Sequence, residues 1–163
     1  MTETWFALWT RSRHEHVVRQ QLERKSIEAF LPTVTRWSHW RDRRKQIDWP
    51  LFPGYCFARF DPCQRLAIVA CTGVVNIVSF AGQPAAIPTP EIEGLRQLLR
   101  SNLAYDPCPM IREATMVEVT HGPLKGVIGR LVRKGPRARL LLAVDLIGQA
   151  VSVEVDAADV RSC

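Results

Sequence analysis

Strand and helix patterns alternate in the first part of this 163-residue chain, whereas only strand patterns follow residue 113. Segments rich in β-branched and aromatic residues, as strands are, occur at "WFALWT" (5–10), "EAFLPTVTRW" (28–37), "GYCFARF" (54–60) and "GVVNIVSF" (73–80). Alternating strands and helices pack as a sheet covered by helices, whereas strands without helices pack as sandwiches or barrels. The change of pattern therefore divides the chain into two parts.

Three helices are expected in the first part. Ser12 and Glu15 have the spacing of a reciprocal capping box, which predicts a helix to about residue 25. Asp61, followed by proline, is typical of the start of a second helix, and Thr89 begins a third that ends near residue 100. The order strand, helix, strand, strand, helix, strand, with one appended helix, is that of the ferredoxin-like split βαβ plan.

The segment 101–113 has two prolines and no periodicity, so it is expected to be a linker. Five strand candidates follow within 114–163: "TMVEVT", "GVIGRLVRK", "RLLLAVDLI", "AVSVEVD" and "DVRS". So many short strands in a small segment favour a β-barrel. The predicted fold class is therefore α+β, with a first domain at 1–100 and a five-stranded barrel at 114–163.

Composition excludes several function classes. The five cysteines show no CxxC and no neighbouring histidine pair, so we expect neither a disulfide framework nor a metal site. No sequence motif of a known catalytic site is present, so we expect no enzyme and no cofactor. No apolar run approaches the roughly 18 residues of a membrane span, and no signal peptide pattern begins the chain, which indicates a cytoplasmic protein.

The segment "PLFPGYCFARF" (50–60) contains four aromatic rings on one predicted strand. Side chains alternate along a strand, so Tyr55 and Phe57 share one face. Helices cover only one face of a split βαβ sheet, so the other face is open unless the appended helix or the second domain covers it. Part of the segment approaches the RNA recognition motif signature, with departures at Pro53, Cys56 and Ala58, so an RNA-stacking sheet is one interpretation. A surface that binds a protein partner is the other.

Several ordered motifs across nearly the whole chain resemble the NusG family of transcription elongation factors, and most closely its specialised RfaH-like antitermination paralogs. These motifs are "WFALWTRSRHE", "EAFLP", "PLFPGYCFARFDP", "GVVNIVSFAGQPAAIP", "VEVTHGPLKGVIGRL" and "LLLAVDLIGQAVSVEVD". The resemblance implies an N-terminal NGN domain, a linker and a C-terminal KOW domain. It also implies a monomer that binds RNA polymerase.

In this family an apolar cavity of the NGN domain grips the clamp helices of the polymerase β′ subunit. The residues at the matching positions are Trp9, Tyr55, Phe57 and Phe80. A contact with the polymerase β lobe stays open, because the hydroxyl-rich segment of RfaH-type proteins is replaced here by "CQRLAIVACTG".

The densest basic run is "RWSHWRDRRK" (36–45), which is predicted to form a hairpin arm. Indoles interleaved with cations suit nucleic acid, since a base stacks on tryptophan while arginine neutralises phosphate. The resemblance directs this side of the domain to the upstream DNA fork and the non-template strand. The candidate residues are Arg36, Trp37, Trp40, Arg41, Arg43, Arg44 and Lys45.

The second domain contains the KOW-like segment "HGPLKG" (121–126), in which two glycines permit a tight turn and Leu124 is expected at an exposed tip. The resemblance implies that this loop contacts a small-subunit ribosomal protein or the Rho terminator. The candidate residues are Gly122, Pro123, Leu124, Gly126 and Ile147.

Overall fold

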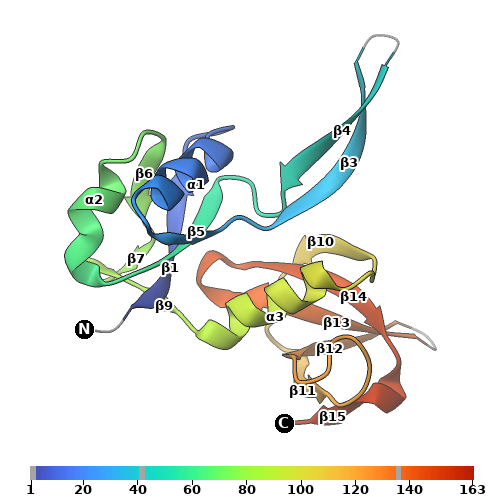
Figure 1. Cartoon of the computed structure of the whole chain (residues 1–163). Coiled ribbons are helices and arrows are strands. Elements are labelled where there is room, and N and C mark those ends of the chain that lie inside the picture. Colours follow the sequence, from blue (N-terminus) through green and yellow to red (C-terminus); the bar gives the residue numbers. More distant parts are fainter. Residues whose placement is uncertain (1–2, 41–42, 135–136) are drawn as a thin grey trace. The chain divides into compact units, whose positions relative to one another are not determined.

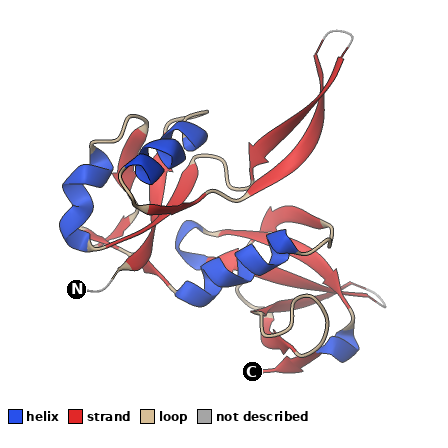
Figure 2. Ribbon diagram, viewed as in Figure 1, coloured by secondary structure: helices blue, strands red, loops and turns tan. Residues whose placement is uncertain are grey.

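A computed structural model of the chain describes residues 3–40, 43–134 and 137–163, without the side chains of 36–40, 43 and 134. The chain divides into two compact units, Met1–Ala86 and Ile87–Cys163. Strands dominate in each, as the red arrows of Figure 2 show. Each unit is described by itself.

The first unit contains an antiparallel sheet in the order β2-β5-β1-β6 (Figure 1). Its elements are β1 (Thr4–Thr10), α1 (Glu15–Arg24), β2 (Glu28–Phe30), β5 (Tyr55–Phe60), η1 (Pro62–Gln64), α2 (Arg65–Val69) and β6 (Val74–Ile77). Two short strands, β7 (Ser79–Phe80) and β8 (Gln83–Pro84), pair beyond it. The predicted order strand, helix, strand, strand, helix, strand is confirmed over these residues.

Apolar side chains of α1 and α2 pack on one face of this sheet. Val18 and Leu22 of α1 join a buried cluster with Phe6 of β1 and Phe60 of β5, whose ring centroids lie 4.6 Å apart. Ile68 of α2 belongs to the same cluster. The narrow apolar stripe of α1 is sufficient to pack the helix on the sheet, because only one face of the helix meets the sheet.

One predicted cap is confirmed and another is wrong. The Asp61 side chain accepts from the Cys63 N–H at 2.9 Å, and Gln64 completes the capping box. At α1 the residue before the helix is His14, and no side chain caps the helix. The Glu15 carboxylate instead accepts from the Gly54 N–H at 3.0 Å, so a tertiary donor replaces the predicted local one.

The basic run lies in a separate two-stranded antiparallel sheet of β3 (Thr33–Trp40) and β4 (Arg43–Pro50). In Figure 1 this hairpin extends away from the sheet that carries β1 and β5. The predicted strand 28–37 is interrupted after Phe30, because Pro32 lacks the N–H that a continuous ladder needs. The predicted hairpin arm is therefore present.

The second unit combines α3 (Thr89–Arg100) with a six-stranded antiparallel sheet in the order β10-β14-β13-β12-β11-β15. The strands are β10 (Tyr105–Pro109), β11 (Thr115–Val119), β12 (Ile128–Lys134), β13 (Arg137–Val144), β14 (Gln149–Val155) and β15 (Val160–Ser162). The short elements are η2 (Asp145–Ile147) and η3 (Ala157–Asp159). The short strand β9 (Ala86–Ile87) instead pairs with β1 and belongs to the sheet of the first unit. All five strand candidates of 114–163 contribute strands to the six-stranded sheet.

Two predicted boundaries differ from the structure. The helix assigned to the first domain lies in the second unit, where α3 contacts β12 and β13 and buries Ile92, Leu95 and Leu98. The expected linker 101–113 contains β10, which pairs with β14. Its two prolines are tolerated because β10 is the outermost strand of the sheet order.

Candidate partner-binding site

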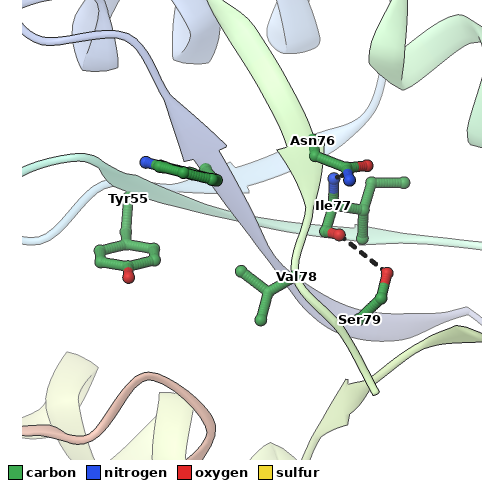
Figure 3. Close-up of a pocket in the computed structure, with 6 residues that line it drawn as sticks. Tyr55, Asn76, Ile77, Val78 and Ser79 are labelled. Carbon is green, nitrogen blue, oxygen red and sulfur yellow. Dashed lines mark hydrogen bonds between the residues drawn. The ribbon is translucent and has the colours of Figure 1, made fainter. Parts of the chain in front are cut away.

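An open pocket of ≈ 350 Å³ lies in the first unit at the end of β1 (Figure 3). Its lining is mostly apolar with a few polar groups, which is the composition of a binding site. The lining residues are Trp9, Tyr55, Asn76, Ile77, Val78 and Ser79. Two of the four predicted polymerase-binding residues, Trp9 and Tyr55, are thus brought together.

Strand register explains how residues distant in sequence meet in this pocket. Trp9 lies opposite Tyr55 of β5 on one side and opposite Asn76 of β6 on the other. Side chains of directly opposed residues share a sheet face, with their Cβ atoms about 5 Å apart. The Trp9 side chain stays 54% exposed although Leu8 and Thr10 beside it are buried.

Hydrogen bonds fix the polar groups at the β6 end of the pocket. The Asn76 side-chain oxygen accepts from the Ile77 N–H at 2.8 Å, and the Ser79 hydroxyl donates to the Ile77 carbonyl at 2.9 Å, as the dashed lines of Figure 3 show. Asn76, Val78 and Ser79 were not predicted from the sequence. Their signal was the strand-like segment 73–80, from which the resemblance assigned Phe80 to the same site.

Phe57 does not lie on an accessible surface, so this expectation is wrong. The side chain is 0% exposed and stacks on Phe30 with ring centroids 6.2 Å apart, while Phe52 meets it edge to face at 6.2 Å. The alternation that places Phe57 on the face of Tyr55 is correct, but neighbouring rings cover it. Phe80 is 79% exposed and lies outside the pocket lining.

The structure describes the predicted nucleic-acid residues only in part. Arg44 and Lys45 are exposed on β4. The backbones of Arg36, Trp37, Trp40 and Arg43 lie in the hairpin strands, whereas Arg41 lies outside the described residues. Trp49, which the sequence analysis missed, is 49% exposed on β4. The sequence feature that could have identified Trp49 is its indole close to the basic run, on the same strand as Arg44 and Lys45.

In the predicted partner loop of the second unit (121–126), the glycines have the expected conformation, but Leu124 is not exposed as expected. Gly122 and Gly126 have φ values of 93° and 89°, which favour glycine. Leu124 is 2% exposed, so its predicted place at an exposed tip is wrong. The Gln97 side-chain amide of α3 donates to the carbonyls of Pro123 and Lys125, each at 3.0 Å, and so holds the loop with Leu124 turned inward. Gly122 and Pro123 are exposed, and Ile147 is half-buried in η2.

Comparison with known proteins identifies the family. Residues 3–96 match the family described as "NusG: Transcription termination factor nusG", which is more than half of the chain. The chain belongs to the NusG family. Members of this family are transcription factors, not enzymes.

One solved structure agrees with this assignment at the level of the fold. "Domain interaction in Thermotoga maritima NusG" covers 98% of this chain and 97% of its own, with 18% identity and a TM-score of 0.56. "Crystal Structure of MjSpt4:Spt5 complex conformation A" covers 98% of this chain and 97% of its own, with 16% identity and a TM-score of 0.35. The Thermotoga protein therefore shares the fold of this NusG-family chain.

The described residues of this NusG-family chain also bear on three further features: a reactive thiol, a metal site and a membrane span. Burial raises the pKa of the Cys56 thiol to about 12, which keeps it protonated and unreactive at neutral pH. Cys71 is buried as well and donates to the Ala67 carbonyl. Among residues 3–40, 43–134 and 137–163, no group of three or more His, Cys, Asp or Glu side chains could hold a metal ion. No helix in the described part of the chain is long and apolar enough to cross a membrane.

Proposed function

We propose that this NusG-family protein is a transcription elongation and antitermination factor that binds the RNA polymerase clamp through the Trp9 pocket. The observation that carries the proposal is the half-exposed Trp9 indole beside Tyr55 in a largely apolar pocket. An exposed aromatic side chain at a pocket is costly to leave in water and is typical of the residues that dominate a protein interface.

The family resemblance directs this pocket to the clamp helices of the β′ subunit. A pocket of ≈ 350 Å³ suits the side chains that a helix inserts into a groove. Phe80, 79% exposed on β7, extends the apolar surface beyond the pocket.

The hairpin arm of β3 and β4 binds the non-template DNA strand near the upstream fork. Exposed Arg44 and Lys45 neutralise phosphates, and the exposed Trp49 offers a stacking surface. With clamp and DNA held together, the factor reduces pausing or termination. The resemblance of its motifs supports a role like that of the RfaH-like paralogs.

We further propose that residues 114–163 of the second unit form a KOW domain that binds a small-subunit ribosomal protein or Rho. Exposed Gly122, Pro123 and Gly126 and half-buried Ile147 are the positions offered to that partner. The factor acts in the cytoplasm as a monomer, without a cofactor.

The alternative of an RNA-binding sheet is weaker. It needs Tyr55 and Phe57 exposed together, so that successive bases stack on them. Phe57 is 0% exposed, which leaves only one of the two rings for a base.

An elongation assay with purified polymerase tests the proposal. The protein is expected to shorten pauses and raise read-through, and Trp9→Ala is expected to remove this effect while the variant stays folded. Gln20→Ala, at an exposed position of α1, is the matched control. If Trp9→Ala retains full activity and full affinity for core polymerase, the pocket is not the binding site.

A further inference from the structure

The two polar atoms of the Asn76 side chain differ in their hydrogen bonding. Its oxygen lies 2.8 Å from the Ile77 N–H, and because this N–H is a donor, the atom that faces it must be the oxygen and not the amide nitrogen. The orientation of the whole amide group is thereby fixed. The remaining Nδ2 group makes no hydrogen bond to any described residue, and Asn76 is exposed at the pocket.

Two other polar side chains of the pocket are also able to donate, whereas the Ser79 hydroxyl already donates to the Ile77 carbonyl. The Trp9 indole carries only a donor, and the Tyr55 hydroxyl can donate. Within the described residues neither side chain has a hydrogen-bond partner. The pocket therefore presents N–H and O–H groups around an apolar centre, and a complementary partner supplies an acceptor.

The spacing of the apolar and polar groups suits a helix. Asn76 and Trp9 are directly opposed on β6 and β1, so their Cβ atoms are separated by about 5 Å. Side chains three or four residues apart on a helix have Cβ atoms about 5–6 Å apart. One helix face can thus place an aliphatic side chain against Trp9 and an oxygen acceptor against Asn76.

We propose that Asn76 is a specificity-determining residue of the pocket: its Nδ2 donates to a side-chain oxygen of the partner helix, three or four residues from the aliphatic anchor. The partner position is thereby restricted to a residue whose side-chain oxygen can accept: Asp, Glu, Asn, Gln, Ser, Thr or Tyr. This inference rests on the proposed function, because the partner helix is taken to belong to RNA polymerase.

Asn76→Asp tests the donor directly. The aspartate keeps an oxygen for the Ile77 N–H but replaces Nδ2 by a second acceptor, so the local turn is preserved and the intermolecular bond is lost. Binding to purified core RNA polymerase is expected to weaken about tenfold or more, since a buried acceptor then lacks its donor. Asn76→Ala, which adds no charge, is expected to weaken binding about three- to tenfold. Melting temperatures of all variants separate a loss of binding from a loss of folding.

Asn102→Asp is the matched control, because Asn102 is exposed in the other unit. It is expected to bind polymerase like the original protein. If Trp9→Ala weakens binding while both Asn76 variants bind normally, the inference about Asn76 is overturned and the pocket proposal stands. If Trp9→Ala also binds normally, the proposed function itself fails. Should Asn76→Asp unfold, unchanged binding by Asn76→Ala alone overturns the inference.

Discussion

Glu91 accepts a hydrogen bond at 3.1 Å from the backbone N–H of Asp145, which ties the first turn of α3 to the segment after β13. Burial of this carboxylate raises the Glu91 pKa above its ordinary value. The Asp145 N–H and the charge of Arg130 oppose the rise without cancelling it. Helix α3 is therefore attached by a group whose charge is disfavoured in the folded state.

The raised Glu91 pKa predicts a pH dependence of stability. The folded state binds more protons than the unfolded state between the ordinary and the raised pKa, so the free energy of unfolding falls as pH rises through this range. Glu91→Gln keeps an oxygen for the Asp145 N–H and removes the titration. At neutral pH the variant is expected to equal or exceed the original protein in stability, by less than about 1 kcal/mol because the group is half-exposed. Urea unfolding at several pH values measures this, and an unchanged pH slope would count against it.

Phe57 and Trp9 are expected to affect different properties. Phe57→Ala removes a fully buried ring and should lower the free energy of unfolding by about 3–5 kcal/mol. Trp9→Ala, at a half-exposed ring, should change it by about 1 kcal/mol or less while weakening the polymerase complex. Denaturant unfolding alongside a binding titration separates the two effects. A Trp9→Ala variant as unstable as Phe57→Ala would show that the indole is structural.

The Gln97 amide is expected to hold the loop at 122–125 in place. Gln97→Glu replaces a donor to two carbonyls by an acceptor, which should cost about 1–3 kcal/mol of local stability. Hydrogen exchange is expected to quicken at the Lys125 and Val127 amides, which bond within this loop. Gln20→Glu on α1 serves as the control and should leave both amides unaffected. Equal protection in Gln97→Glu would mean that the loop holds its own conformation.

Charge reversal on the hairpin arm is expected to weaken binding to nucleic acid. Arg44→Glu combined with Lys45→Glu removes two exposed cations. The slope of log affinity against log salt for single-stranded DNA should become shallower by about 0.7 for each phosphate that the arm no longer neutralises. Arg65→Glu with Arg133→Glu, also exposed, is the control for overall charge. Identical slopes for the two double variants would exclude a specific role of the arm.

Local signals in the sequence predicted those features that neighbouring residues decide. The Asp61 cap formed as expected because all its partners lie within three residues. At Glu15 the same reasoning failed, since a backbone N–H from Gly54, 39 positions away, took the carboxylate. The placement of α3 also depends on distant residues: it buries Ile92, Leu95 and Leu98 in the second unit, where the helix contacts β12 and β13.

The sequence by itself determined the order of elements in the first unit, the hairpin arm, the turn glycines and the family, because each depends on patterns repeated over short stretches. Tertiary structure alone decided which rings face water. Alternation placed Tyr55 and Phe57 on one face, but Phe30 and Phe52 bury Phe57, whereas Tyr55 stays at a pocket beside Trp9 and Asn76. Exposure depends on neighbours that register and packing bring from distant segments, and no local pattern records them.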